Sequence, residues 1–428
     1  MREQRGEKRL QRNVSLLCGC VFAIFCFTFI AIYQSPLLEA LYDKVATGKL
    51  NYNGYVVATI ATTILLLLSW WMNRVARFQR EWTAMSYLPA TLILAFITDI
   101  DETIYTGKRD YLSWTIIMLV GLFIYASLAF LLQRILFAKI KNPQMEGNRI
   151  VWRNLFLFAI MFVLAGWFSN GNENLKYEAT AYSHYKRGDV EGALNVASRS
   201  LNASRELTAA RAFYLSQKGS LGDKLFCYPQ YYGAEGLLPS LVQQSPLSPD
   251  SVYSALEAKR NDGERAMEYL YRVANNDSVS KIAADYYLCG LLLDKRLSEF
   301  IESLPRYYDL KQGSSLPLHY KEALILYATA ISDVKLSFNS DTLRAELSSM
   351  GLLNWKKGDK LPAHYIEAFK HFAISSDELA AILELDTLGN NFADVLDIER
   401  QYPDLMIRSN FVKKQFGHTY WWYYSYSN

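Results

Sequence analysis

The stretch Val14-Ser-Leu-Leu-Cys-Gly-Cys-Val-Phe-Ala-Ile-Phe-Cys-Phe-Thr-Phe-Ile-Ala-Ile-Tyr33 decides the architecture, because none of its twenty residues is charged. A bilayer core about 30 Å thick is crossed by roughly 20 helical residues, each rising about 1.5 Å. The stretch therefore predicts a membrane-spanning helix. A cleaved signal peptide is the alternative, but the apolar run is long for one and no Ala-x-Ala site follows, so a retained anchor is favoured.

Four more apolar runs follow and predict, together with the first, a five-helix transmembrane domain over 14–168. The third run is shorter than the others and contains Pro89. A buried core helix of a soluble protein is the alternative for each run, but soluble helices of this length seldom lack charge. The expected spans are 14–33, 55–72, 84–97, 112–132 and 150–168, after a basic cytoplasmic tail at 1–13.

The basic residues predict how these spans are oriented. Thirteen Lys and Arg lie in the N-terminal tail and in the connections after the second and fourth spans, against four in the other two connections. The positive-inside rule then places the N-terminus in the cytoplasm, and five crossings place residues 169–428 on the outer face. We expect a bacterial inner-membrane protein whose first partner is the lipid bilayer, with the C-terminal domain periplasmic or extracellular.

Charge also argues against two functional classes. The whole chain has 45 basic and 42 acidic residues, a net charge of +3, which gives no excess for binding nucleic acid. No Asp, Glu, Lys, Arg or His lies deep in an expected span. Ion-coupled transporters depend on such groups, so a transporter is disfavoured.

The second half of the chain, 169–428, has the three-and-four spacing of helices and predicts an all-α domain. Its clearest unit, 176–201, resembles a tetratricopeptide repeat, with a large Tyr177, a small Ala181, and a turn at Gly188 before a second helix that holds Ala193 and Ala197. Weaker units are expected at 207–225, 282–304, 320–350 (320–331 paired with 341–350) and 362–385. The resemblance implies a soluble repeat superhelix that follows the membrane domain.

Two aromatic segments stand out in this half. The segment 226–239 contains Tyr228, Tyr231 and Tyr232 among Pro and Gly, so it cannot form one continuous helix. It is either a binding loop or a packed connection. The C-terminal segment 416–426 is denser in aromatic residues, and it either caps the last repeat, docks at the membrane interface or binds a partner.

Few residues suggest chemistry. The sequence has no phosphate-binding loop, no Gly-x-Ser-x-Gly and no His-Glu-x-x-His. Asp99, Asp101 and Glu102, at the expected outer end of the third span, are a weak candidate site for a divalent cation. An Asp-x-Asp pair in an outer loop is also found in enzymes that transfer sugars from lipid carriers. Cys227 and Cys289 form either a disulfide or, as we favour, two small buried thiols.

Three segments are similar to an uncharacterised family of bacterial multi-pass inner-membrane proteins with a C-terminal tetratricopeptide-repeat-like domain. They are Gly222-Asp-Lys-Leu-Phe-Cys-Tyr-Pro-Gln230, His319-Tyr-Lys-Glu-Ala323 and Thr419-Tyr-Trp-Trp-Tyr-Tyr424. The resemblance implies architecture and no activity.

We therefore expect a scaffold or assembly factor that presents a helical-repeat domain to a protein partner in the cell envelope. A membrane glycosyltransferase acting on a lipid-linked substrate through Asp99 and Asp101 is the alternative. In the scaffold, no catalytic residue, metal or cofactor is expected. The residues expected to bind the partner are Tyr177, His184, Tyr185, Tyr228, Tyr231 and Tyr232.

Overall fold

The computed structural model confirms the predicted all-α class. Every regular element in the part of the chain that it describes is a helix. By its contacts the chain forms two compact units, unit 1 (Met1–Ser183 with Gln244–Pro246) and unit 2 (His184–Gln243 with Leu247–Asn428). The described residues are 2–46, 52–76, 78, 80–101, 103, 111–131, 147–200, 202–240, 245–276, 280–310, 316–331, 360–361, 363–372 and 375–427.

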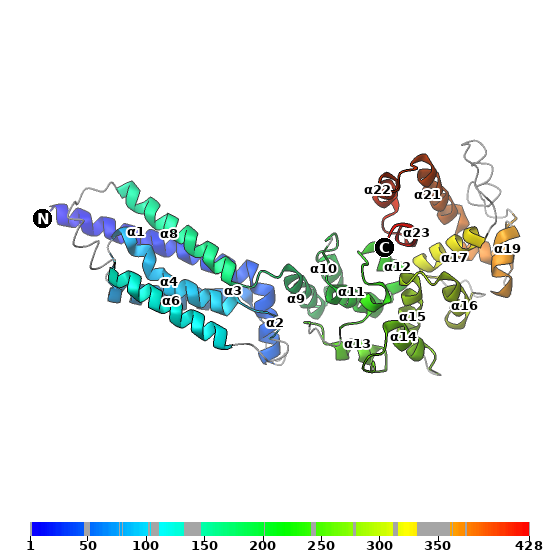
Figure 1. Cartoon of the computed structure of the whole chain (residues 1–428), viewed down its shortest axis with the longest axis horizontal. Coiled ribbons are helices and arrows are strands. Elements are labelled where there is room, and N and C mark those ends of the chain that lie inside the picture. The colour runs from blue at the N-terminus through cyan, green and yellow to red at the C-terminus, as the bar shows by residue number, and fades with distance from the viewer. Residues whose placement is uncertain are drawn as a thin grey trace. The chain divides into compact units, whose positions relative to one another are not determined.

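Unit 1 is a bundle of apolar helices (Figure 1). Its elements are α1 (Arg2–Thr28) with the π-helical η1 (Phe29–Tyr33), α2 (Ser35–Ala46), α3 (Gly54–Ala76), the 3₁₀ segment η2 (Arg80–Tyr87), α4 (Leu88–Thr98), α6 (Tyr111–Leu131) and α8 (Gly147–Phe168).

Four helices of unit 1 are long and apolar enough to cross a membrane, which corrects the expected five. They are Arg12–Tyr33, Gly54–Ala76, Leu112–Leu131 and Asn148–Phe168. The third expected span, 84–97, lies in the shorter apolar helix Trp82–Thr98. Pro89 stands in the first turn of α4 and Trp82 has a non-helical φ of −122°. Since Pro donates no backbone hydrogen bond, the chain before it forms a separate 3₁₀ segment instead of a longer α-helix.

The outer surfaces of the four long helices are apolar. No more than 28% of each apolar stretch is buried inside the protein. Large side chains such as Ile64, Phe123 and Val163 are more than half exposed. A soluble protein rarely exposes so much contiguous apolar surface, so unit 1 is that of a membrane protein.

The shorter apolar helix Trp82–Thr98 nevertheless runs alongside α8 over most of the length of α8. At one end the Ala84 amide donates to Asn154 Oδ1 at 2.8 Å, and at the other Asn170 Nδ2 donates to the Ile100 carbonyl. Both pairs are 70 residues apart in sequence, so the two segments keep one register and run in the same direction. The 16 residue steps between these contacts correspond to about 24 Å of helix.

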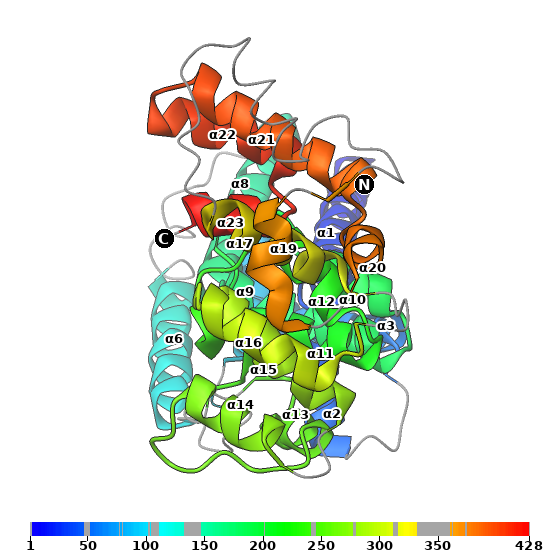
Figure 2. The same cartoon turned by 90° about the vertical axis from the view of Figure 1, so that its right-hand side faces the viewer.

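Unit 2 follows α9 (Glu173–Lys186), whose last turn belongs to it, and is built of short helices (Figure 2). Its first half contains α10 (Val190–Asn195), α11 (Arg205–Gln217), α12 (Leu221–Lys224), η4 (Leu225–Cys227), η5 (Gly233–Leu237), α13 (Pro249–Ala255) and α14 (Ala266–Ala274). Its second half contains α15 (Lys281–Leu293), α16 (Leu297–Tyr307), α17 (Leu318–Ile331), α19 (Ala363–Phe369), η6 (Lys370–Phe372), α20 (Ser376–Leu383), η7 (Leu385–Gly389), α21 (Asn390–Gln401), α22 (Leu405–Phe416) and α23 (Tyr420–Tyr426).

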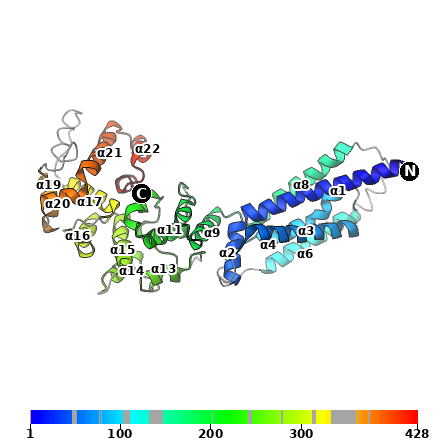
Figure 3. The same ribbon diagram turned by 180° about the vertical axis from the view of Figure 1, so that it is seen from behind.

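Some of the helix pairs expected in unit 2 are present, and others differ from the expected boundaries. The unit at 282–304 is a hairpin of α15 and α16, which pack on each other (Figure 3). In the unit at 176–201, Gly188 takes the left-handed φ of +80° expected at the turn. Its second helix ends at Asn195, however, and Ala197 lies outside it with φ +48°. The expected partner helix at 341–350 lies outside the described residues.

Candidate functional site

Three segments that are far apart in the sequence meet in unit 2, and they are the three that carry the family resemblance. Asp223 Oδ1 accepts a hydrogen bond from the Leu318 amide at 2.7 Å, at the start of α17. A side chain at Gly222 would place its Cβ 2.7 Å from Pro317, so this close approach requires glycine. At the other end, the Tyr420 amide donates to Glu322 Oε2 at 2.7 Å.

Phe226 is the centre of the aromatic cluster that these segments form. Its ring centroid lies 5.0 Å from that of His319, 5.1 Å from that of Tyr420 and 4.9 Å from that of Tyr423. Trp421 Nε1 donates to the Glu322 carbonyl at 2.8 Å. Figure 2 shows α23 beside α17, on which it packs. The aromatic C-terminus is thus part of the core of unit 2, which favours the capping interpretation over docking at the membrane interface.

A fully buried ion pair lies under this cluster. His319 Nδ1 donates to Glu322 Oε2 at 2.9 Å, and both side chains are at most 2% exposed. Burial lowers the pKa of His319, but the Glu322 carboxylate and the Cys227 thiol outweigh burial and raise that pKa to about 9. His319 therefore carries a proton at neutral pH. Its second nitrogen, Nε2, has no hydrogen-bond partner.

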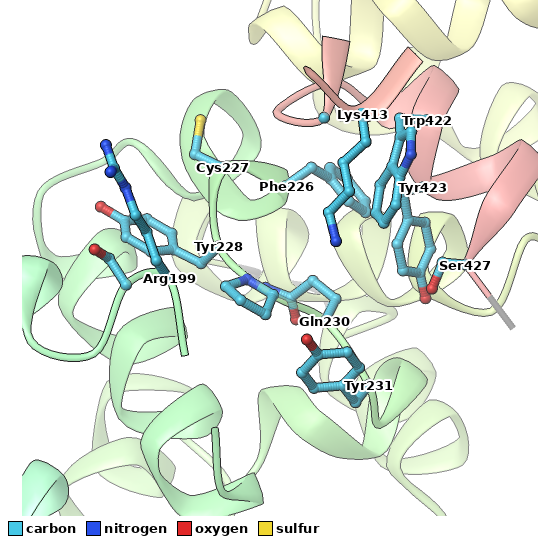
Figure 4. A pocket seen from close by; sticks show the side chains of 13 residues that line it. Arg199, Phe226, Cys227, Tyr228, Gln230, Tyr231, Lys413, Trp422, Tyr423 and Ser427 are labelled. Carbon is cyan, nitrogen blue, oxygen red and sulfur yellow. The ribbon is translucent and has the colours of Figure 1, made fainter. Parts of the chain in front are cut away.

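A pocket of about 240 Å³ adjoins the cluster, and we call it the aromatic pocket. In Figure 4 the loop after α12 supplies Tyr228 and Tyr231 on one side, and the C-terminal segment supplies Trp422 and Tyr423 on the other. The pocket is lined by Ser198, Arg199, Phe226, Cys227, Tyr228, Pro229, Gln230, Tyr231, Lys413, Gly417, Trp422, Tyr423 and Ser427.

Positive charge surrounds the aromatic pocket. Lys413 and Arg199 line it, and none of its thirteen lining residues is Asp or Glu. Lys413 Nζ lies 5.1 Å from the ring centroid of Trp422. Behind the wall, the guanidinium of the buried Arg211 lies 5.4 Å from the ring centroid of Tyr228.

The hydrogen bonds of the Arg211 guanidinium include none to a carboxylate. Its Nη2 donates to the Val196 carbonyl at 2.6 Å, while Nε and Nη1 have no hydrogen-bond partner. Burial lowers the pKa of Arg211 to about 10, so the side chain stays charged at neutral pH. A buried charge that lacks a counter-ion favours an anion nearby.

Of the six residues predicted to bind a partner, Tyr228 and Tyr231 line the aromatic pocket and the other four do not. Tyr232 is 40% exposed and its hydroxyl donates to the Ala203 carbonyl at 3.0 Å. Tyr185 stacks on Tyr214 with centroids 4.4 Å apart. His184 Nδ1 lies within hydrogen-bond distance of Asp189 Oδ2, at 2.8 Å. Tyr177 is half-buried and belongs to unit 1.

The acidic cluster of unit 1 is engaged by protein donors. Asp99 Oδ2 accepts from Trp114 Nε1 at 2.5 Å, and Asp101 Oδ1 accepts from the amide and hydroxyl of Thr103. Glu102 lies outside the described residues. Across the described part of the chain, no three His, Cys, Asp or Glu side chains are grouped so as to hold a metal ion.

Cys227 and Cys289 are both free thiols. Cys289 is buried as expected, with its Sγ 3.5 Å from the Tyr320 hydroxyl, but Cys227 is exposed at the aromatic pocket. Cys227, His319 and Glu322 lie in segments that share the family resemblance, but their spacing in the sequence does not predict that these segments meet. No spacing rule links a loop cysteine to a histidine on a distant helix, so only the resemblance pointed to both.

The comparisons with known proteins agree with an uncharacterised family. Residues 250–427 match the model of a family of unknown function (DUF6057). No curated protein and no solved structure matches the chain. The matched region includes His319, Glu322 and Lys413, whereas Cys227 and Arg211 precede it.

Proposed function

We propose that this protein is a membrane-anchored binding protein whose unit 2 captures an acidic segment of a protein partner in the bacterial envelope. One observation carries the proposal. The aromatic pocket combines aromatic walls with Lys413 and Arg199 and has no carboxylate in its lining.

The size and chemistry of the pocket favour a peptide side chain as the occupant. A volume of about 240 Å³ is smaller than most cofactor sites and suits one large side chain. Aromatic rings are frequent anchors at protein interfaces. Lys413, Arg199 and the buried Arg211 attract negative charge, so an acidic segment with one apolar or aromatic anchor is the complementary partner.

The anchoring part of the proposal counts the shorter apolar helix Trp82–Thr98 as a fifth crossing of the inner membrane, beside the four membrane-length helices. The shared register of Ala84–Asn154 and Ile100–Asn170 supports a crossing by η2 and α4 in the same direction as α8. The excess of basic residues in alternate connections supports a cytoplasmic N-terminus. Unit 2 then faces the outer compartment and acts as a helical scaffold.

The test uses two charge-reversed variants on one helix. Lys413 lines the pocket, whereas its exposed neighbour Lys414 does not, so Lys414→Glu is a matched control for Lys413→Glu. The full-length protein in detergent is titrated into a fluorescent nonapeptide of glutamates around one tryptophan, and binding is followed by anisotropy. The same peptide with lysines in place of glutamates is the charge control.

We expect the acidic peptide to bind, and Lys413→Glu to lower its affinity roughly tenfold, which is the size of effect that a charge pair at an interface has. Lys414→Glu should leave the affinity within about twofold, because exposed charges outside the contact are screened by salt. Equal binding of the acidic and basic peptides, or equal loss in the two variants, would contradict the proposal.

A further inference from the structure

Exposed apolar side chains of unit 2 gather on one helix, α22. Among the described residues of this unit, eight large hydrophobic side chains are exposed, and four of them belong to α22. These four are Leu405 (62% exposed), Met406 (77%), Ile407 (49%) and Phe411 (40%), and we call them the apolar tip. Single exposed hydrophobic residues are normal on a protein surface, whereas a cluster of them marks an interaction surface.

The apolar tip belongs to an ordered helix. Helices α21 and α22 are joined by a short turn and pack on each other (Figure 1). Asp404 Oδ1 accepts a hydrogen bond from the Ile407 amide at 2.9 Å, which caps the start of α22. The Phe411 ring stacks on that of Tyr402, which directly follows α21, with centroids 4.2 Å apart. The exposure of the tip is therefore a property of the folded unit.

The arrangement of the tip suits a bilayer better than a groove on a protein. Leu405, Met406 and Ile407 are successive, and successive residues of a helix lie about 100° apart around its axis. Their side chains therefore cover about 200° of the circumference at the start of the helix. A protein groove binds one stripe of residues spaced three and four apart. A bilayer interface is fluid and accepts an apolar helix end of any shape.

The charge of α22 identifies the kind of bilayer. The helix contains Arg408, Lys413 and Lys414 and no acidic residue, whereas residues 376–401 before it contain seven acidic residues and one basic residue. Both lysines are exposed. Clusters of basic residues beside an apolar surface attract anionic lipids. The electrostatic complement of α22 is therefore a negatively charged membrane surface.

The distance between the apolar and basic residues also fits this surface. The two lysines follow Ile407 by six and seven residues, which corresponds to about 9–10 Å along the helix axis. Interfacial helices bury their apolar side chains about 5–10 Å into the boundary between headgroups and acyl chains. A tip at that depth leaves the lysine amines at the level of the lipid phosphates.

We propose that the apolar tip of α22 docks into an anionic phospholipid bilayer, with Lys414 at the lipid phosphates. Lys413, which lines the aromatic pocket, adds to the positive charge. Unit 1 holds the chain in a membrane, and such tethering raises the effective concentration of a bilayer surface for unit 2. This docking goes beyond the capture of an acidic segment and does not depend on it.

The experiment places a fluorophore on the tip of the full-length protein in lipid nanodiscs. The two exposed cysteines, Cys20 and Cys227, are replaced by serine, and Met406→Cys is labelled with the environment-sensitive dye nitrobenzoxadiazole. The discs contain either phosphatidylcholine alone or equal parts of phosphatidylcholine and phosphatidylglycerol. A nitroxide lipid, which quenches the dye on contact, is placed in the discs or in added vesicles of the same composition. The two placements distinguish the membrane that holds unit 1 from a second membrane.

We expect a blue shift and quenching of the dye at position 406 with phosphatidylglycerol, in at least one of the two placements. The same dye at Ile366→Cys should stay unquenched, because Ile366 is exposed on α19, away from the tip. Ile407→Asp should abolish the quenching at position 406. Its matched control is Ile366→Asp, since the two isoleucines are 49% and 47% exposed. Protection of the buried Cys289 from labelling verifies that each variant is folded.

Lys414→Glu separates membrane docking from peptide binding. It should lower the docking equilibrium constant at least about fivefold, because each basic residue near an anionic surface contributes an effect of that size. The same variant should leave the acidic peptide bound, so failure of one proposal is visible without the other. Absence of quenching in both placements would overturn the docking proposal and assign the tip to a protein partner. Equal quenching with and without phosphatidylglycerol, or equal quenching at positions 406 and 366, would also contradict it.

Discussion

At the scale of single residues, the site depends on contacts that the sequence does not reveal. Arg211 lies in the middle of α11 among buried neighbours, where helical spacing predicts only core packing. The pair His319 and Glu322 has the ordinary spacing of a surface helix pair, yet both are buried. Gly188, by contrast, was predictable, because a left-handed turn residue between two helices favours glycine.

Unit 2 should lose stability as pH rises through the pKa of His319. The folded pKa, about 9, lies above the unfolded value near 6.5. The stabilisation, of order 3 kcal/mol, is therefore fully present below about pH 6.5 and lost as pH rises through about 9. The measurement is the temperature at which Cys289 becomes reactive to a thiol dye, followed from pH 6 to 10. Glu322→Gln should flatten this dependence, and an unchanged slope would show that the pair is not its source.

Gly222→Ala should destabilise unit 2 by about 1–3 kcal/mol, since a Cβ there would lie 2.7 Å from Pro317 and 2.9 Å from Tyr320. The same Cys289 reactivity measurement applies. Gly171→Ala is the control, because a Cβ at that position meets nothing within 4 Å. A Gly222→Ala protein as stable as the control would mean that α12 and α17 do not approach so closely.

At the scale of elements, α23 shows why amino-acid composition alone could not predict where the C-terminal segment lies. A run of tyrosines and tryptophans is equally suited to a core, a membrane interface or a binding surface. The structure places Tyr420, Trp421 and Tyr423 in the core and leaves Trp422 at the aromatic pocket. Helix α10 shows the same limit, because the repeat pattern predicted its start and turn but not its early end at Asn195.

Two neighbouring tryptophans of α23 should therefore respond differently to alanine. Trp421 is 1% exposed and bonds the Glu322 carbonyl, so Trp421→Ala should cost about 3–5 kcal/mol. Trp422→Ala removes a half-buried wall of the pocket, so it should lower the stability of unit 2 by less than Trp421→Ala does. It should also weaken the binding of the acidic peptide. Thermal unfolding monitored at Cys289 and peptide anisotropy separate the two effects. Similar losses of stability in both variants would contradict this placement of α23.

At the scale of the whole molecule, the sequence was enough for the class and for most of the membrane helices. Long uncharged runs have few alternatives to a bilayer, so four spans were predicted within a few residues. The third failed as a membrane-length helix because Pro89 and Trp82 divide it into a 3₁₀ and an α-helical part. Its path beside α8 appears only through long-range hydrogen bonds.

The proposed topology, four membrane-length helices and the shorter helix Trp82–Thr98 as a fifth crossing, presents unit 2 with its aromatic pocket on the outer face of the membrane. The exposed Cys227 tests it directly, since Cys289 is buried and the other cysteines lie in α1. Intact cells with a permeabilised outer membrane are treated with a membrane-impermeant maleimide, and Cys227→Ser is the control. We predict labelling of Cys227 before the inner membrane is broken. Labelling only after lysis would place unit 2 in the cytoplasm and contradict the five crossings.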